Sequence, residues 1–269
     1  MQSFEINKIP VLRFSIFPDN GLIHFVTTAN GGIGKEEYAT FNLGEYCGDD
    51  AGVVEKNRGL LAAALKINTT DILVPYQTHG DKICVIDKDF LSKAECERKE
   101  RLKGIDALIT KEKNICIGIT TADCVPILLF DPKKDIFAAI HAGWKSTCYS
   151  IVLKTIRLIM EKFGTEPSDL LAGIGPSISA EKFEVGDEVG RAFEEGGYDL
   201  SFFSYRNRDT KKLHIDLKEA NRLQLLNAGV LFENIEVSEL CTYSTPEQLF
   251  SARRQGFYSG RMLTGGILI

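Results

Sequence analysis

The sequence predicts an α+β fold, a layered sandwich of mixed sheets and helices, in one domain over residues 1–269. Three observations support this class. Four apolar runs follow one another closely in the middle of the chain, helical periodicity is confined to a few separate segments, and no linker or low-complexity stretch divides the sequence. With 269 residues, 44% of them hydrophobic and 26% charged, the chain can bury a substantial core.

The expected strands are short and apolar. Only four or five residues separate the four central runs, which is too few for intervening helices and favours neighbouring antiparallel or mixed strands. The expected strands cover residues 22–28, 72–77, 82–86, 105–110, 115–120, 125–130, 136–141, 170–174, 212–215 and 263–269.

The expected helices are marked by caps and by apolar spacing. Asp50 and Asp216 are suitable N-caps, and Gly164 is a natural C-terminal stop behind a helix that carries Ile151 and Thr155 on one face. The charged stretch 88–103 is interpreted as exposed helix or loop. The remaining helices are expected at residues 53–66, 147–163, 187–195 and 217–226.

Composition excludes several classes of protein. A net charge of −5 argues against a nucleic-acid partner, which usually requires a basic face. Residues 1–17 lack the pattern of a signal peptide, and no apolar run is long enough to span a bilayer, so we expect a cytoplasmic protein without a membrane partner. Seven cysteines without paired spacing do not predict a disulfide framework.

One cysteine and two histidines stand at the ends of strand-like runs. Cys124 lies between two such runs, His141 ends the next, and His79 follows an earlier one, so these side chains can meet at one edge of a sheet. One thiolate and two imidazoles with an open fourth position are the pattern of a catalytic zinc site. His24 and His214 fall within strand patterns and are interpreted as structural.

The same residues fit a second class of enzyme. In a metal-free hydrolase, Cys124 would be the nucleophile and His79 or His141 the base. Asp123 fits equally well as a catalytic acid and as a carboxylate that orients a ligand, whereas Asp106 is a weaker candidate because an aspartate that opens a strand is commonly a turn residue. A non-catalytic binding protein with a structural metal is the third hypothesis.

Several short motifs occur in order along the chain. They are Asn42-Leu43-Gly44, Gly48-Asp49-Asp50, Asn57-Arg58, Gln77-Thr78-His79-Gly80, Asp106-Ala107-Leu108, Thr121-Ala122-Asp123-Cys124-Val125-Pro126, His141-Ala142-Gly143-Trp144, Gly173-Ile174-Gly175-Pro176-Ser177, Cys241-Thr242-Tyr243, Phe250-Ser251-Ala252-Arg253-Arg254 and Gly260-Arg261-Met262. In this combination the chain, from about residue 25 to its end, resembles the YfiH/YlmD-type family. That family was long labelled laccase domain or polyphenol oxidase and is now associated with purine nucleoside phosphorylases.

The resemblance implies a four-layer α/β/β/α fold with zinc bound by His79, Cys124 and His141. It also implies phosphorolysis of adenosine, inosine, guanosine and methylthioadenosine to a free base and a sugar 1-phosphate, together with deamination of adenosine. The expected partners are therefore purine nucleosides and phosphate, and the expected state is a monomer or small homo-oligomer. Copper is disfavoured, because four histidines are too few for the trinuclear cluster of a laccase.

Phosphate and nucleoside require polar ligands from the same motifs. For phosphate, we favour Arg58, Arg253 and Arg254 over Lys145 and Arg261. Trp144 is interpreted as a core residue. The chain departs from the family at Ala29 and Ala252, where an arginine and an aromatic residue often stand. The expected substrate ligands are Asn42, Arg58, Gln77, Arg253 and Arg254.

Overall fold

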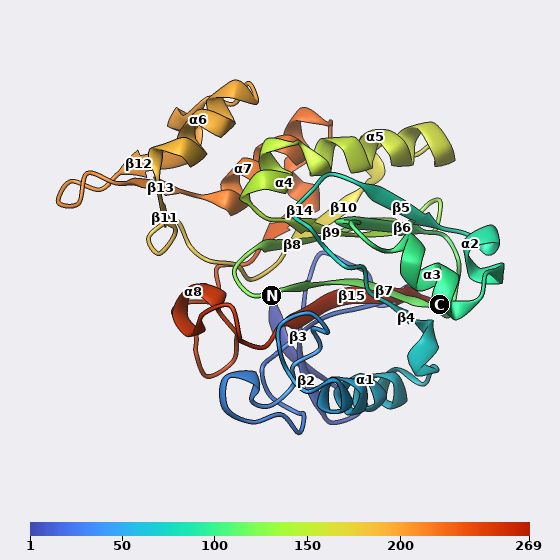
Figure 1. Ribbon diagram of the computed structural model, residues 1–269. Coiled ribbons are helices and arrows are strands. Elements are labelled where there is room, and N and C mark those ends of the chain that lie inside the picture. The colour runs from blue at the N-terminus through green and yellow to red at the C-terminus, as the bar shows by residue number, and fades with distance from the viewer.

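The structure, a computed structural model, describes residues 1–269 and has four layers (Figure 1). Two six-stranded mixed sheets pack face to face, with α1 below one of them and α4, α5 and α7 above the other. The predicted α+β class and the α/β/β/α layering are confirmed. None of the helices has both the length and the apolar character needed to cross a membrane.

The first sheet contains both ends of the chain, and its strand order is β1-β2-β3-β15-β7-β4. The second sheet has the order β14-β10-β8-β9-β6-β5. The strands of the first sheet are β1 (Gln2–Ile6), β2 (Ile9–Arg13), β3 (Leu22–Thr27), β4 (Ile72–Leu73), β7 (Cys116–Thr121) and β15 (Met262–Leu268). Those of the second are β5 (Ile83–Ile86), β6 (Ala107–Thr110), β8 (Val125–Asp131), β9 (Ile136–Ala142), β10 (Leu171–Ile174) and β14 (Ile235–Val237).

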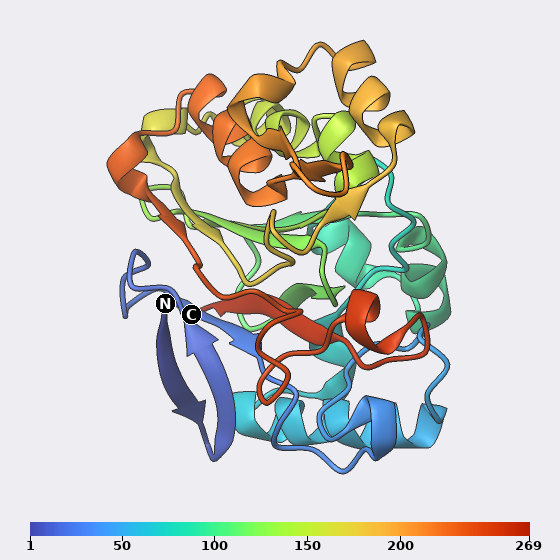
Figure 2. The same cartoon turned by 90° about the vertical axis from the view of Figure 1, so that its left-hand side faces the viewer.

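A small three-stranded sheet and one helix project from one end of the sandwich (Figures 1 and 2). The small sheet contains β11 (Glu184–Val185), β12 (Ser204–Arg206) and β13 (Leu213–Ile215), and the helix is α6 (Asp187–Glu195). The other helices are α1 (Ala51–Leu65), α2 (Lys88–Ser92), α3 (Glu95–Arg101), α4 (Trp144–Cys148), α5 (Ile151–Phe163), α7 (Leu217–Asn227) and α8 (Ala252–Gln255).

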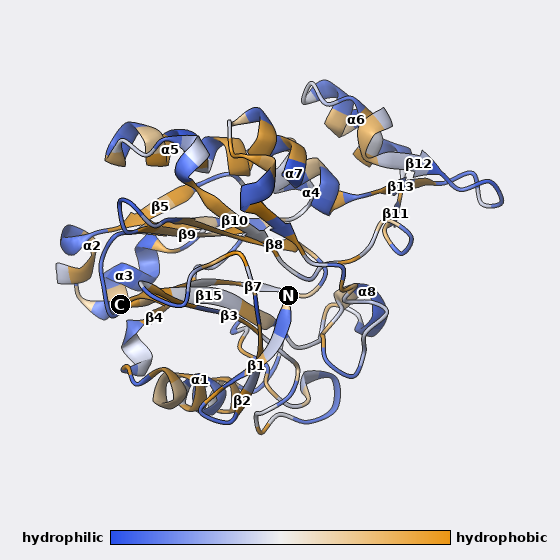
Figure 3. Ribbon diagram, turned by 180° about the vertical axis from the view of Figure 1, so that it is seen from behind, coloured by the Kyte–Doolittle hydropathy of each residue, from blue (hydrophilic) through white to orange (hydrophobic).

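Each interface between layers has its own apolar core. Leu61 of α1 packs with Phe25 against the outer face of the first sheet. Ile117 and Phe130 belong to the core between the two sheets, and Ile156 of α5 to the core above the second sheet. The central strands are therefore buried on both faces, which explains why they are continuous apolar runs rather than alternating ones, and β8 and β9 are coloured as hydrophobic in Figure 3.

The four central runs do not all lie in one sheet, contrary to the prediction that they are neighbours. The second of them, β7, pairs with β15 and β4 in the first sheet, while the other three pair in the second. The predicted strand 72–77 contains only the two residues of β4, after which the chain leaves the sheet toward the other layer. The N-terminal hairpin of β1 and β2 and the strands β11, β12 and β14 were not predicted.

The predicted helix 147–163 is two helices. Ser150 adopts a left-handed conformation with φ of 58° and separates α4 from α5. The hydroxyl of Tyr198 donates to the carbonyl of Thr147 at the end of α4 and lies 2.7 Å from the hydroxyl of Ser150. A distant tyrosine thus contacts a carbonyl that a continuous helix would have paired within itself. The caps at Asp50 and Asp216 and the stop at Gly164 are confirmed.

Two neighbouring leucines of α1 test the layering. Leu61 is fully buried under the first sheet, whereas Leu60 is 39% exposed. We expect Leu61→Ala to lower the free energy of unfolding by about 2–5 kcal/mol, because it leaves a cavity in a packed core. The matched control Leu60→Ala should cost less than about 1 kcal/mol. Urea unfolding of both variants measures this difference, and equal losses would contradict the packing described for α1.

Candidate metal centre

The candidate metal centre lies where the chain crosses twice between the two sheets. One crossing runs from β4 in the first sheet to β5 in the second and carries His79. The other runs from β7 to β8 and carries Cys124. His141 is the last residue but one of β9, where it pairs with Pro126 of β8, so the strand register brings it close to Cys124 at the same end of the sandwich.

The three predicted ligands come together. One ligand atom from each of His79, Cys124 and His141 lies within 4.8 Å of the other two. The two imidazole rings are 4.8 Å apart at an interplanar angle of 73°. His141 is buried and His79 is exposed, so this set of side chains is open on one side. One thiolate and two imidazoles can hold a metal ion with a coordination position left for another ligand.

The buried carboxylate of Asp106 holds two of these ligands. It accepts hydrogen bonds from the backbone amides of Thr78, His79 and Gly80 at 3.2, 3.0 and 2.8 Å. Its Oδ1 also lies 2.7 Å from Nδ1 of His141. Placing the proton on Nδ1 makes the imidazole the donor and leaves Nε2 free for a metal, the usual arrangement of a metal-ligating histidine. Asp106 therefore has an orienting role and is not the turn residue that the sequence suggested.

Two residues of the centre have unusual backbone conformations. His79 has a φ of 60° and Asp123 a φ of 99°, both rare for residues other than glycine. The carboxylate of Asp123 accepts from the hydroxyl of Thr242 and from the backbone amide of Arg253, each at 2.6 Å. Such conformations persist where surrounding contacts fix them, and they gather at functional sites. Asp123 is thus tied to the C-terminal segment and not to a metal ligand.

Gly143 approaches the ligands closely. A Cβ atom at this position would lie 2.8 Å from the ring of His79 and 3.1 Å from Sγ of Cys124. Any larger residue directly after β9 would displace one of these side chains. Glycine is therefore required here by space and not by backbone conformation.

Cys124 and His141 shift each other's ionisation. Burial favours the neutral thiol, but the charge of His141 and hydrogen bonds from His141 and His79 outweigh it and lower the pKa of Cys124 to about 6. Burial likewise opposes the charged imidazole, yet the Cys124 thiolate and Asp106 raise the pKa of His141 to about 9. The environment therefore stabilises the thiolate form that a metal ligand needs.

The centre opens into a cavity of about 550 Å³, which we call the main cavity. Its wall includes all three ligands, Asp123 and Gln77. Gln77 uses its whole amide on Thr120, whose carbonyl accepts from Nε2 and whose amide donates to Oε1. Aromatic side chains that the sequence analysis missed also line the cavity, because no local pattern distinguishes them from core residues. These are Tyr46, Tyr76, Phe183 and Phe257.

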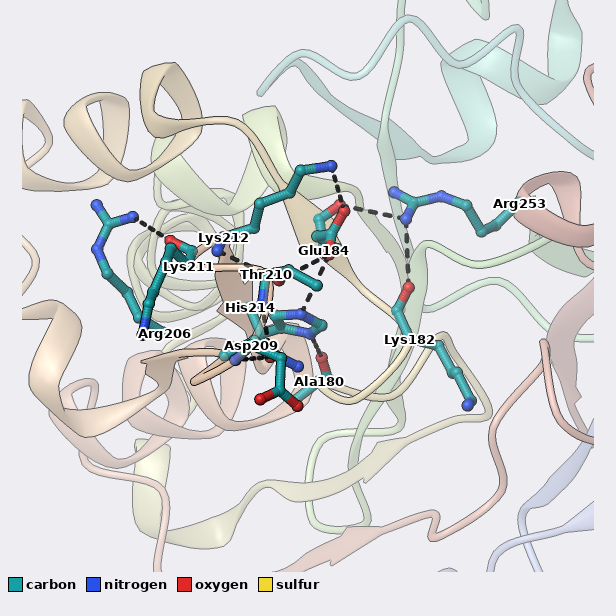
Figure 4. A network of polar contacts seen from close by, with 11 residues as sticks. Ala180, Lys182, Glu184, Arg206, Asp209, Thr210, Lys211, Lys212, His214 and Arg253 are labelled. Atoms are coloured by element: carbon teal, nitrogen blue, oxygen red, sulfur yellow. Dashed lines mark hydrogen bonds and ion pairs between the residues drawn. The ribbon is translucent and has the colours of Figure 1, made fainter.

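Three guanidinium groups line the main cavity, and they differ in how their charge is balanced. Arg58 donates to the carbonyl of Leu43 and forms an ion pair with Glu45. Arg261 donates only to neutral oxygens of residues 257–260. Arg253 donates to the carbonyls of residues 182 and 184 at 3.2 Å and lies over the ring of Phe183, as Figure 4 shows for its carbonyl contacts. Arg253 and Arg261 therefore face the cavity with uncompensated positive charge.

Other predicted substrate ligands lie outside the main cavity. Asn42 is fully buried, and its amide contacts Asp49 and the backbone of Gly44 and Arg261. Arg254 donates to the carbonyls of residues 242, 243 and 249. Both side chains hold loops together and are not among the residues that line the main cavity, so their predicted contact with substrate stays a prediction. Ala29 is also buried away from the cavity, whereas Ala252 lines it.

The remaining cations and histidines have structural surroundings. Lys145 is exposed, with its amine 5.5 Å from the ring of Trp144, which itself packs against the core above the second sheet. His24 is buried, with its Nε2 atom 3.0 and 3.2 Å from the backbone nitrogen and oxygen of Phe14, and His214 stacks on Tyr205 in the small sheet. Neither histidine belongs to the His79–Cys124–His141 group, in agreement with their interpretation as structural residues.

Comparison with known proteins agrees with this architecture. A family model described as multi-copper polyphenol oxidoreductase laccase matches residues 23–268. The chain belongs to this family. The resemblance seen in the sequence motifs is thereby confirmed.

The relatives of this protein are named as nucleoside enzymes and not as laccases. It is 45% identical to a purine nucleoside phosphorylase of Bacteroides thetaiotaomicron, over 91% of each chain. It is 42% identical to adenosine deaminase RL5 of an unknown prokaryotic organism, over 91% of this chain and 93% of the relative. The crystal structure of YlmD from Geobacillus stearothermophilus superposes with a TM-score of 0.85 at 33% identity, over 92% of each chain.

Replacing Asp106 tests whether it orients the centre. In Asp106→Asn, an amide nitrogen replaces one of the two oxygens that accept from the backbone amides of residues 78–80, and this nitrogen cannot accept, so we expect metal affinity to fall about 10–100-fold. The control Asp131→Asn changes another fully buried carboxylate that accepts backbone amides, those of Lys133 and Lys134, in a different part of the fold. Titration with zinc measures both affinities. An unchanged affinity in Asp106→Asn, or an equal loss in the control, would contradict the orienting role.

Proposed function

We propose that this protein is a zinc-dependent purine nucleoside phosphorylase that also deaminates adenosine. The observation that carries the proposal is the open His79–Cys124–His141 group in the wall of a cavity with two uncompensated guanidinium groups. The names of the relatives, purine nucleoside phosphorylase and adenosine deaminase, support the same reading. The substrates would be a purine nucleoside together with phosphate, or adenosine with water.

The three side chains fit zinc by their chemistry. Thiolate and imidazole are the ligands that zinc prefers, and the contact between His141 and Asp106 is the outer contact that such sites usually have. A zinc ion held there would supply Lewis acidity and activate water near neutral pH. Copper oxidase chemistry is a poor fit, because this is the one such group of histidines and cysteines in the structure and the other two histidines lie elsewhere.

Phosphate would bind at Arg253 and Arg261. Their guanidinium groups contact only neutral oxygens, so their charge remains available to an anion in the cavity. Arg58, which the motif analysis favoured, already pairs with Glu45 and would need to exchange that partner. The proposed phosphate site therefore lies at Arg253 and Arg261, near the C-terminus of the chain, and not at Arg58 in α1.

Asp123 would act on the sugar. Cleavage of the glycosidic bond builds positive charge on the ribose, and a fixed carboxylate beside it lowers the barrier. Asp123 lines the cavity next to Cys124, and its contacts to Thr242 and Arg253 fix its position. A carboxylate can accept further contacts after these two. The bond from the Arg253 amide would also place the sugar and phosphate sites side by side.

A metal-free cysteine hydrolase is the second candidate. The lowered pKa of Cys124 and the adjacent His141 are what a cysteine nucleophile and its base require. The orientation of both histidines toward one point by Asp106 favours the metal enzyme instead, since a hydrolase needs only one base.

Chromatography of inosine incubated with the purified full chain separates these candidates. We expect hypoxanthine and ribose 1-phosphate only when phosphate is present, and conversion of adenosine to inosine without it. Removal of metal by a chelator should abolish both reactions, and added zinc should restore them. Activity that survives metal removal would favour the hydrolase, and no product from inosine, adenosine or methylthioadenosine would exclude the proposal.

Two cysteine variants accompany this assay. Cys124→Ala removes the thiolate and should lower turnover by at least about 100-fold, because the metal loses one of three ligands. The control Cys96→Ala changes an exposed cysteine in α3 and should leave the rate unchanged. Full activity of Cys124→Ala would exclude both enzyme hypotheses.

The phosphate site is tested by Arg253→Gln. We expect the KM for phosphate to rise about tenfold or more, because a charge-assisted bidentate contact is lost. The KM for inosine should change less. Arg206→Gln is the control, since Arg206 is exposed and paired with Asp187 in the projecting sheet. Steady-state kinetics at varied phosphate concentration measure the effect, and an unchanged KM for phosphate would refute the assignment.

A further inference from the structure

A second cavity, of about 660 Å³, adjoins the main cavity, and we call it the side chamber. Its outer walls come from α1, the short turn Thr69–Asp71 and α3. It shares part of its wall with the main cavity, so a ligand in one lies against the same side chains as a ligand in the other. The shared residues are Glu45, Tyr46, Arg58, Val74 and Tyr76.

Arg98 lines the side chamber and has no partner. The Nε–H group of this half-buried side chain is buried without a hydrogen bond, and its guanidinium forms no ion pair in the structure. The other two cations of the chamber are already paired, Arg58 with Glu45 and Lys99 with Glu95. A buried donor without an acceptor is uncommon and calls for an explanation, such as an absent water or ion.

The chemistry of the chamber favours a phosphate group. Arg98 presents a planar fork of donors that matches phosphate oxygens, and the neighbouring Thr69 and Thr70 bring hydroxyl groups. Glu55 also lines the chamber but is exposed and forms no ion pair with Arg98. The rings of Tyr46 and Tyr76, 4.4 Å apart on the shared wall, offer an aromatic surface to the organic part of the ligand.

We propose that the side chamber binds a nucleoside monophosphate, with its phosphate on Arg98 and its organic part against Tyr46 and Tyr76. Only the nucleoside part of this ligand rests on the proposed function; the phosphate part rests on Arg98. Because the two cavities share the tyrosines, a nucleotide in the side chamber hinders the entry of a nucleoside into the main cavity.

Calorimetric titration of the full chain with adenosine monophosphate tests the site without any turnover. We expect Arg98→Gln to weaken binding about tenfold or more, because the paired donors to phosphate are lost. The matched control is Arg101→Gln in the same helix, whose arginine pairs with Glu97 and Asp89 and does not line the chamber. Thermal melting verifies that both variants fold, and Arg98→Lys, which keeps the charge but loses the fork, should give an intermediate affinity.

Titration with orthophosphate distinguishes the source of the phosphate group. The proposal expects the unchanged protein to bind adenosine monophosphate at least about tenfold more tightly than orthophosphate, because only the nucleotide also contacts Tyr46 and Tyr76. Equal affinities for the two ligands would overturn the nucleotide assignment, as would absent nucleotide binding or equal losses in Arg98→Gln and Arg101→Gln. Since binding is measured directly, an inactive protein that binds the nucleotide through Arg98 would refute the proposed function but not this site.

Discussion

The arrangement of the candidate metal centre depends on the contacts of the Asp106 carboxylate. Burying a charge is costly, and here four hydrogen-bonding contacts offset that cost: three backbone amides and the ring of His141. The amides belong to the crossing segment that carries His79, while His141 belongs to β9. One side chain therefore joins a loop and a strand whose sequence positions differ by more than sixty residues. The left-handed turn at His79 is what points its amide and both neighbouring amides at the same carboxylate.

The layering of the fold gives this contact its place. Two strands of the first sheet, β4 and β7, each continue into a strand of the second, and a crossing between packed sheets must pass around their edge. Such segments leave the sheet ladder, so their side chains are free to face a shared space. Helix α8, which precedes β15 of the first sheet, lies against the same space, because the backbone amide of Arg253 donates to Asp123. The sandwich core thus positions the loops, and the loops supply the chemistry.

The grouping of His79, Cys124 and His141 could be predicted from the sequence because each lies at or near the end of an apolar run, and the ends of strands gather at sheet edges. The role of Asp106 could not, because it depends on the pairing of β6 with β9 and on the turn at His79, neither of which has a local signal. Motif membership also failed to separate residues that line the cavity from residues that hold loops, as Asn42 and Arg254 show. Likewise, the carbonyl at the break between α4 and α5 accepts from Tyr198 and Gln224, which are both distant in sequence.

The hydrogen-bonding partners of the arginines indicate the chemistry of the main cavity better than the number of arginines does. An arginine beside a carboxylate, such as Arg58, contributes little net field, whereas one held by carbonyl oxygens keeps its charge and is already oriented. The backbone contacts of Arg253 and Arg261 are fixed before any ligand arrives, so an anion meets prepared donors and little reorganisation is needed. A phenol oxidase acting on neutral substrates has no use for such charge beside its metal. The proposed phosphorylase would use such charge to bind phosphate, and the carboxylate of Asp123, which accepts from the Arg253 amide, lies in the same cavity wall.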